Sequence, residues 1–323
     1  MKNVKDFILS VTKASNCEEV EVIQSLWSGY GKIARYQLTG VEAKTVIVKH
    51  IIFPTETNHP RGWNTNNSHI RKVKSYQVET VFYENYNSIC THECKTPKLL
   101  GSTTVGEEQV IILEDLDAAG FPIRKSVLTF DQVKVCLKWL ANFHATFLNV
   151  KPDNLWEVGT YWHLETRPDE FAEMNASPLK QAASAIDDLL NNCKHQTFVH
   201  GDAKVANFCF SEDMTKVAAL DFQYVGGGCG MKDVVYLMGS CLLENECKNF
   251  EKELLVHYFN QLENALSKNS KHLNFNQLKT EWSFLFPIAW ADFERFLMGW
   301  MPTHQKINGY SKLKVEEALK QID

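Results

Sequence analysis

The stretch FVHGDAKVANFCF, residues 198–210, decides how this chain is interpreted. Its ends are apolar, yet four polar side chains fall within eight residues: His200, Asp202, Lys204 and Asn207. The apolar run predicts a short buried strand at 197–199, and the polar residues then occupy the loop after it. An acid, a base and an amide beside a buried strand indicate a functional site.

A second short strand is predicted at 217–220, and Asp221 of the sequence LDFQ stands at its end, fourteen residues after Asn207. An amide and a carboxylate on neighbouring strand ends suit Mg²⁺, which takes few protein ligands and leaves room for substrate phosphates. Asp202 stays free to accept a proton. Lys204 follows it by two residues, so in an extended chain both side chains point to the same side.

This set meets the demands of phosphoryl transfer, which depends on positioning and charge neutralisation. The alternative is a loop in which Asp202 and Asn207 only satisfy backbone groups, as these residue types often do. The order of four motifs, a strand lysine, a helix glutamate, HGD and DFQ, favours a kinase-like fold.

The lysine and the glutamate lie upstream. VIVK ends at Lys49 on the third predicted strand, where a kinase places the lysine that binds the α- and β-phosphates. Glu79, in the helix YQVETVFYENY, is its expected ion-pair partner, with Glu84 as the less favoured choice. An ordinary surface salt bridge is the alternative for any such pair.

The motifs carry a family resemblance. H-x-D-x-K-x-x-N at 200–207 has the spacing of the protein-kinase catalytic loop. HGD followed by Asn207 and DFQ resembles the aminoglycoside phosphotransferase and choline kinase superfamily. The string DFQYVGGGCGMKDVVYLMGSCL resembles its ecdysteroid kinase-like (CHK-domain) branch. The resemblance implies ATP and Mg²⁺ as cofactors.

The same resemblance implies roles for the residues of the loop. Asp202 would be the catalytic base or the group that orients the substrate, and Asn207 with Asp221 would bind magnesium. His200 would brace the loop through hydrogen bonds, and Lys204 would contact the γ-phosphate.

Two further segments are candidates for nucleotide contacts. The turn at 28–31 includes Gly29 and Gly31, which let backbone NH groups approach phosphates closely, although a simple hairpin turn is equally consistent. VIILEDLD at 110–117 resembles the strand and hinge of a kinase. Adenine would bind there to the backbone of Glu114, Asp115 and Leu116.

The hydrophobic pattern predicts a β-rich first third and an α-rich remainder. Strand candidates are 19–27, 32–40, 44–53, 97–103 and 108–114, with a loop at 54–67 and a helix from Ser68, as its cap, to about Asn87. Thr129 and Gln132 form a capping box. Later helices are expected at 179–192, 232–244, 249–267, 276–300 and 311–321.

We therefore predict an α+β, bilobal protein-kinase-like fold. Its small antiparallel lobe, 1–116, would bind nucleotide, and its larger, mainly helical lobe, 117–323, would carry catalysis and substrate binding, with the junction near 115–120. Asp233 is expected to cap the helix after the glycine turn or to tie down the loop, and His144 to be a core histidine.

Composition excludes several classes of function. The net charge of -5 and a pI of about 6.1, without a basic aromatic segment, argue against nucleic acid as a partner. Nine scattered cysteines fit a reducing cytoplasm, and no signal peptide or membrane span is expected. The cluster of Cys90, His92 and Cys94 lacks the fourth ligand of a structural zinc site, so an ordinary helix-end or loop position is favoured.

The sequence does not decide which molecule accepts the phosphate. Ten residues separate Asp221 from Lys232, too few for the activation segment of a peptide kinase. Three tryptophans with two nearby carboxylates, Trp282, Trp290, Trp300, Asp292 and Glu294, could hold a cationic amine or simply form packing core. The ecdysteroid kinase-like resemblance instead implies a hydroxylated apolar acceptor.

The predicted function is that of an ATP-dependent small-molecule kinase. It would transfer the γ-phosphate to an alcohol group, or an amine, of a small metabolite, xenobiotic or antibiotic, with no obligate protein partner. The alternative is a catalytically silent nucleotide-binding or scaffold protein that keeps the kinase fold.

Overall fold

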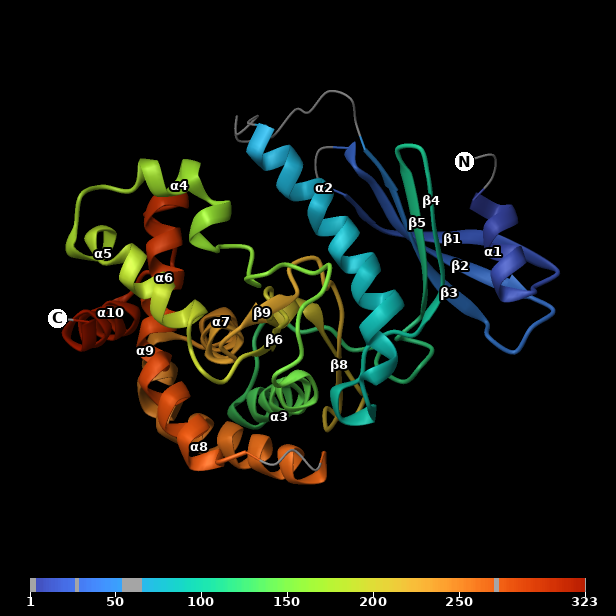
Figure 1. Cartoon of the computed structure of the whole chain (residues 1–323). Helices are drawn as coiled ribbons and strands as arrows, with labels where there is room; N and C mark the ends of the chain where they lie inside the picture. Colours follow the sequence, from blue (N-terminus) through green and yellow to red (C-terminus); the bar gives the residue numbers. More distant parts are fainter. Residues whose placement is uncertain (1–3, 27–28, 54–65, 270–272, 323) are drawn as a thin grey trace.

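The computed structural model describes residues 4–26, 29–53, 66–269 and 273–322. The described chain forms two lobes, a small antiparallel sheet and a larger, mainly helical part, as Figure 1 shows. The sheet has the spatial order β1 (Asn16–Ser25), β2 (Gly31–Thr39), β3 (Thr45–Ile52), β5 (Glu108–Glu114) and β4 (Leu99–Val105). The predicted fold class is confirmed, while the boundary after residue 116 stays a prediction.

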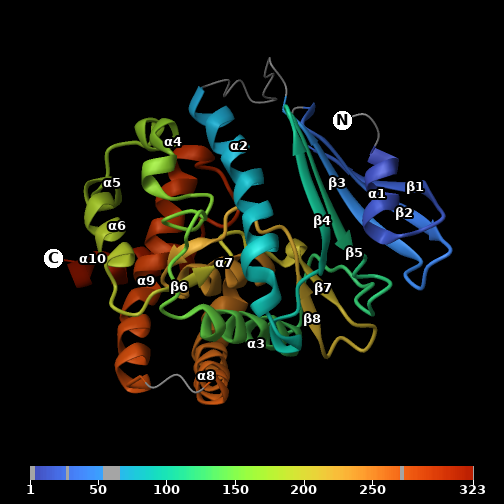
Figure 2. The same cartoon turned by 45° about the vertical axis from the view of Figure 1, so that its right-hand side comes forward.

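The sheet is buried on both faces by one helix each. Along β5, Val110 and Ile112 pack with Ile8 of α1 (Val4–Thr12), while Ile111 and Leu113 join the core that includes α2 (Asn66–Val81). The continuous apolar run VIIL fits this double burial, since successive side chains of a strand point to opposite faces. Figures 1 and 2 both show α2 between the sheet and the helical lobe.

The long predicted helix around α2 differs from the structure at both ends. It begins at Asn66, so Ser68 lies inside the helix and the prediction that it caps the helix is wrong. After Val81 the backbone widens into a π-helical turn, Phe82–Tyr86, a feature that often occurs near functional sites. Phe82 stacks there on Phe222 of DFQ, with ring centroids 4.1 Å apart.

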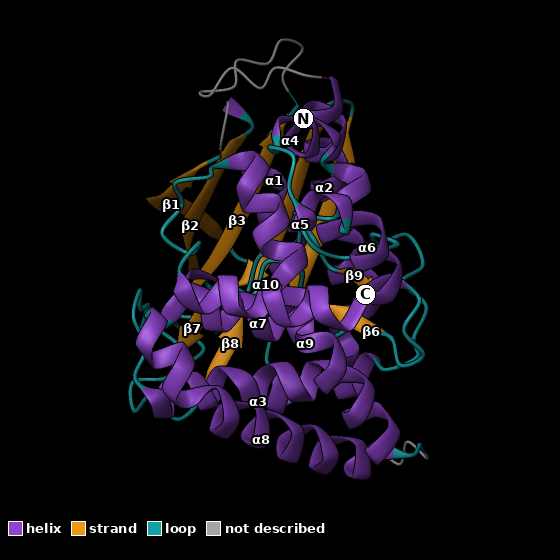
Figure 3. Ribbon diagram, turned by 90° about the vertical axis from the view of Figure 1, so that its left-hand side faces the viewer, coloured by secondary structure: helices purple, strands orange, loops and turns teal. Residues whose placement is uncertain are grey.

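The second lobe is built from helices α3 (Phe130–Phe147), α4 (Pro168–Glu173), α5 (Pro178–Gln181), α6 (Ala183–Asn191), α7 (Met231–Cys241), α8 (Glu244–Lys268), α9 (Phe275–Trp300) and α10 (Gly309–Ile322). The predicted capping box of Thr129 and Gln132 is confirmed at the start of α3. Figure 3 shows α3 and α8 packed along each other, and Phe130 contacts Phe250 at a centroid distance of 4.8 Å. In the described ranges, each helix is too short or too polar to cross a bilayer.

Two short two-stranded sheets carry the polar motifs between the helices. β6 (Thr197–Val199) pairs with β9 (Gly226–Gly228), and β7 (Phe208–Phe210) pairs with β8 (Val217–Ala219). The sequence interpretation missed β9, because glycine is depleted in strands. Glycine is required there because a Cβ on Gly226 would lie 2.1 Å from the carbonyl oxygen of Trp156.

Candidate active site

The loop between β6 and β7 brings three predicted side chains together. Lys204 Nζ donates to Asp202 Oδ2 at 2.8 Å, which confirms that the two side chains share one side of the chain. Asn207 Nδ2 donates to the same oxygen at 3.0 Å and to the Asp202 carbonyl at 2.8 Å. Because these bonds use the amide nitrogen, the Asn207 amide oxygen is directed away from Asp202 and suits a cation.

Asp221 joins this group through the β7–β8 hairpin. Asn207 directly precedes β7 and Asp221 follows β8, so antiparallel pairing brings both to the same end. The Leu220 amide donates to the Asn207 carbonyl at 3.0 Å and closes that end. Asp221 has a φ of 68°, a left-handed conformation that is uncommon for a residue with a side chain, and Gln223 Nε2 donates to its Oδ1 at 2.8 Å.

Lys49 of β3 reaches the same place from the small lobe. Its Nζ lies 2.5 Å from Glu79 Oε2 and 3.8 Å from Asp221 Oδ1, and both members of the Lys49 and Glu79 pair are buried. Glu84, the less favoured partner, instead accepts a hydrogen bond from Ser102 at the surface. The choice of Glu79 over Glu84 is therefore what the structure shows.

His200 holds the loop in shape, as the resemblance implied. The Asp202 amide donates to His200 Nδ1 at 3.3 Å, so the ring proton is on Nε2, which donates to the Leu220 carbonyl at 3.0 Å. Gly201 has a φ of 78°, and a Cβ there would lie 2.1 Å from the Tyr224 carbonyl oxygen. A glycine is therefore required between the histidine and the aspartate.

Asp233, in the first turn of α7, anchors the loop from below. Its oxygens accept hydrogen bonds from the backbone amides of His200, at 2.6 Å, and Gly201, at 2.9 Å. His144 Nε2 lies 3.1 Å from the same carboxylate, and its Nδ1 pairs with the Tyr258 hydroxyl at 2.7 Å. Of the two predicted roles for Asp233 the structure shows the tie to the loop, and His144 is a satisfied core histidine.

The electrostatics of the two central carboxylates differ. Burial raises the pKa of Asp202, helped by the negative charge of Asp221 and opposed by the Lys204 ammonium. Burial also disfavours the charged form of Asp221, but the ammonium groups of Lys49, Lys204 and Lys72 outweigh it and lower its pKa. Asp221 thus stays ionised, as a metal ligand must, while Asp202 is the more basic of the two.

Lys72 of α2 is a site residue that the sequence interpretation missed. Its Nζ donates to Gln223 Oε1 at 2.9 Å and lies 4.6 Å from the centre of the Tyr76 ring. Burial lowers the pKa of this lysine to about 8. The available signal was helical spacing, because positions 72, 76 and 79 share one face of α2.

The described part of the glycine turn lies at the end of a hairpin. The Leu26 amide donates to the Gly31 carbonyl at 2.8 Å, closing a hairpin between β1 and β2. Gly31 has a φ of 112°, and a Cβ there would lie 2.0 Å from the His50 carbonyl oxygen. Gly29 also has a positive φ, 77°, and Ser28 lies outside the described residues.

The expected hinge follows β5. Glu114 pairs with Lys95 at 2.5 Å, and the buried Asp115 carboxylate accepts from Arg35 Nε at 2.7 Å. Leu116 is buried in a small cluster with Cys209 and Ala218 of the larger lobe. The charged side chains of Glu114 and Asp115 are therefore committed to the protein.

The tryptophans expected near the acceptor are mostly packing core. Trp282 and Trp290 are buried, and Trp282 Nε1 donates to the His195 carbonyl at 2.9 Å. Asp292 is buried and paired with Arg295 at 2.8 Å, so its charge is neutralised inside the protein. Trp300 is half-buried and stacks on Phe296, with centroids 5.7 Å apart.

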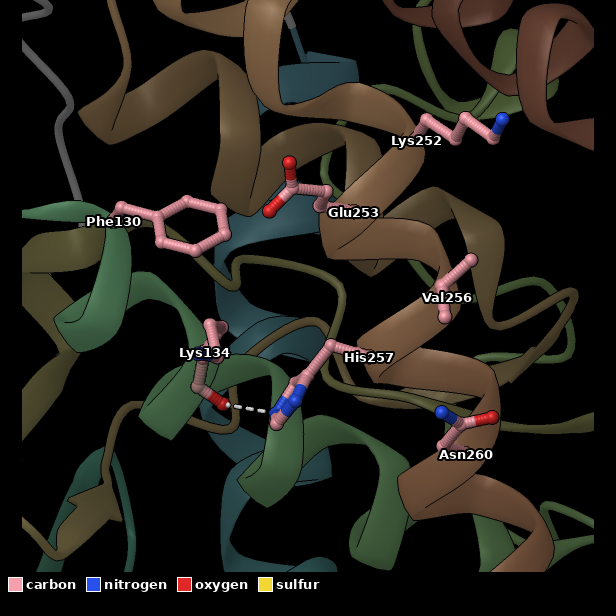
Figure 4. A pocket seen from close by; sticks show the side chains of 7 residues that line it. All are labelled: Phe130, Lys134, Lys252, Glu253, Val256, His257 and Asn260. Carbon is pink, nitrogen blue, oxygen red and sulfur yellow. Dashed lines mark hydrogen bonds between the residues drawn. The ribbon is translucent and has the colours of Figure 1, made fainter.

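Other polar groups lie apart from this centre. Cys90 and Cys94 stand at the ends of short helical turns and the His92 side chain is 91% exposed, so the cysteine cluster has the predicted helix-end position. Within the described ranges no three His, Cys, Asp or Glu side chains converge on a common point. Figure 4 shows a groove of about 540 Å³ between α3 and α8, lined by Phe130, Lys134, Lys252, Glu253, Val256, His257 and Asn260, and it includes none of the predicted site residues.

The two lobes and the loop between β6 and β7 define a protein-kinase-like fold, and comparisons with known proteins agree. Residues 34–161 match the profile of the Ecdysteroid kinase-like family, which confirms the resemblance to this branch. Residues 164–293 match a family described as "Uncharacterized oxidoreductase dhs-27". The ladders of the described sheets are antiparallel, whereas a dinucleotide-binding oxidoreductase fold uses a parallel sheet. No curated protein matches the sequence.

Solved structures that are similar to this chain include small-molecule kinases. An ethanolamine kinase of Plasmodium vivax has a TM-score of 0.50 at 10% identity, over 94% of this chain and 82% of that chain. An aminoglycoside-3'-phosphotransferase of type VIII has a TM-score of 0.45 at 11% identity, over 82% and 93% of the two chains. An aminoglycoside phosphotransferase of Streptomyces rimosus, in complex with ADP and streptomycin, has a TM-score of 0.44 at 10% identity, over 80% and 90%. At these identities the likeness concerns the fold.

Proposed function

We propose that this chain is an ATP-dependent kinase that phosphorylates a hydroxyl group, or an amine, of a small molecule. The observation that carries the proposal is the meeting of Lys49, Asp202 and Asp221 from three separate segments, with Asn207 and Glu79 directed at the same point. A buried group of charged side chains at this place serves no packing purpose, because each buried charge requires a partner.

The residues fit a magnesium ion that also binds phosphates. The Asn207 amide oxygen and the ionised Asp221 would supply two oxygen ligands, and Mg²⁺ commonly takes its remaining ligands from phosphates and water. The ion would neutralise phosphate charge. Lys49, fixed by Glu79, would bind the phosphates from the opposite side.

Asp202 would act on the acceptor. It accepts the proton of the acceptor hydroxyl as the hydroxyl oxygen bonds to the γ-phosphorus, and ADP leaves with the electron pair of the bridging oxygen. Its raised pKa favours accepting that proton, and Lys204 and Asn207 hold the receiving carboxylate in place. His200 and Asp233 act through the backbone of the loop as positioning residues.

ADP release with MgATP and a panel of alcohols, sugars, sterols, aminoglycosides and choline analogues tests the proposal. We expect acceptor-stimulated ADP release by the wild type and by Asp131→Ala, whose side chain is 85% exposed, and its loss in Asp202→Ala. Equal background rates for all three folded proteins would contradict the proposal. Stabilisation by ATP without a requirement for Mg²⁺ would instead favour a silent nucleotide-binding protein.

A further inference from the structure

An aromatic wall borders the proposed catalytic base. It consists of Tyr161, Tyr236 of α7, and Phe293 and Phe296 of α9, with ring centroids 5.5 Å apart for Tyr161 and Tyr236 and 5.1 Å for Tyr236 and Phe293. The Tyr161 amide donates to the carbonyl of Gly201, the residue before Asp202, at 3.2 Å. Burial raises the pKa of Tyr236, and the Tyr161 hydroxyl and the Asp202 carboxylate act in the same direction. An acceptor that gives its proton to Asp202 must therefore lie near this wall.

The protein's own cations already occupy the ring faces of the wall. Lys306 Nζ lies 4.5 Å from the centre of the Tyr236 ring and 5.3 Å from that of Phe293. The Arg167 guanidinium lies 5.8 Å from the centre of Tyr161 and 5.3 Å from that of Phe296. A cationic ligand uses such faces for cation-π attraction, so the ring faces that Lys306 and Arg167 cover are not available to it.

The two cations differ in their partners. Arg167 is paired with Glu170 at 2.9 Å. Lys306, in the segment between α9 and α10, is partly buried and has no ion pair with any carboxylate of the described ranges. Asp292, which precedes Phe293 in the sequence, is bound to Arg295 and Trp162 instead.

A partly buried ammonium without a carboxylate carries a desolvation cost. In agreement with this, burial lowers the pKa of Lys306 to about 8, although the charge of Asp202 acts in the opposite direction. An anionic group bound beside Lys306 would remove this cost. A cationic group there would add to it.

We propose that the acceptor carries an anionic group, such as a carboxylate, sulfate or phosphate, which binds Lys306 while its hydroxyl faces Asp202. This inference rests on the proposed function, because it places the acceptor at the proposed base. It deepens that function by assigning Lys306 as the residue that selects acceptors by charge.

Three probes that share one ring and one hydroxymethyl group test the charge preference: para-hydroxymethyl benzoate, para-hydroxymethyl benzyl alcohol and para-hydroxymethyl benzylamine. Each is titrated by calorimetry into the protein with MgADP present. We expect wild type to bind the benzoate at least about tenfold more tightly than the alcohol, as charged hydrogen bonds allow, and the amine most weakly. Equal binding of the three probes, or tighter binding of the amine, overturns the proposal.

Variants assign the preference to one residue. Lys306→Met should bind the benzoate and the alcohol alike, Lys306→Arg should keep the preference, and Lys312→Met, at an exposed position of α10, should match wild type. A folded Lys306→Met protein that keeps the preference overturns the assignment. Failure of the proposed function has a different signature, since charge-selective binding would then persist without ADP release that depends on Asp202.

Discussion

Two buried carboxylates on either side of one loop show how an anchor differs from a working group. Asp233 uses both oxygens on the protein, binding the amides of His200 and Gly201, and it is fully buried. The Asp202 carboxylate instead accepts hydrogen bonds from the side chains of Lys204 and Asn207, both at Oδ2. The anchor thus binds backbone amides that shape the loop, whereas the working carboxylate, the proposed base, is met by other side chains of the site.

The largest effect is expected when the working carboxylate is removed. Asp202→Asn should lower acceptor-dependent ADP release by about 10²- to 10⁴-fold, the usual contribution of a general base. The melting temperature should be kept or rise, because burial already disfavours the charge of Asp202. If Asp202→Asn unfolds at the assay temperature, Asp202 is also needed for stability, and the distinction from Asp233 is wrong.

The anchor should fail in the opposite way. Asp233→Ala leaves two backbone amides and the Nε2 atom of His144 unpaired in the core, so we expect a loss of about 3–5 kcal/mol in the free energy of unfolding. Chemical denaturation measures this loss. Asp131→Ala is the matched control, because it is also an acid in the first turn of a helix but is exposed, and its change should stay below about 1 kcal/mol.

The lysine of β3 tests whether the small lobe contributes to catalysis. Lys49→Met removes a cation aimed at the phosphates, and we expect a loss of about 10²-fold in turnover. Glu79→Gln should show a smaller loss, because the lysine itself remains. Steady-state assays at saturating MgATP separate the two variants, and equal losses would mean that the pair acts as one unit.

The contribution of Lys72 is expected to be smaller again. Lys72→Met should lower turnover about tenfold, equivalent to about 1.5 kcal/mol for one lost charged hydrogen bond. Lys74→Met, two residues along α2 at an exposed position, is the control and should be active. Unchanged turnover in Lys72→Met would limit its role to packing on Tyr76.

The smallest effect is a displacement of the pH profile. Asp202 must be ionised to accept a proton, so activity should rise as the pH passes its pKa. The Lys204 ammonium lowers that pKa, and Lys204→Met should therefore move the acid limb of kcat/KM to higher pH. Lys216→Met, an exposed lysine, should leave the limb in place, and a displacement to lower pH in Lys204→Met would contradict the assignment.

Much of the fold and of the central loop could be predicted because their signals are local. Alternation and capping residues mark the strands and α3, and the spacing from His200 to Asn207 sets which side chains share a side. The strand β9 could not be predicted, because its three glycines form a strand only under close backbone contacts from elsewhere, such as that of Trp156 with Gly226.

The part of the site that sequence interpretation missed depends on contacts between distant segments. Lys72 matters because Gln223 meets it from another lobe, 151 residues away, and no local pattern reports that contact. Trp282 is an aromatic residue of the kind that binds cations, yet it is buried in the core. Lys306 lies over rings of α7 and α9, which are distant from it in sequence. Spacing along one element is therefore informative about which residues can act, and packing decides which of them do.

The clasp of α2 and its π-helical turn on the DFQ segment has one further consequence. Phe82 stacks on Phe222 and Lys72 binds Gln223. The two residues that follow Asp221 are therefore both held by one continuous helix, α2 with its π-helical turn. The left-handed backbone of Asp221 is thus held in place by these contacts within the protein. A divalent ion at the proposed site would meet a carboxylate that needs little further ordering. A change in the orientation of this helix would therefore break both contacts together.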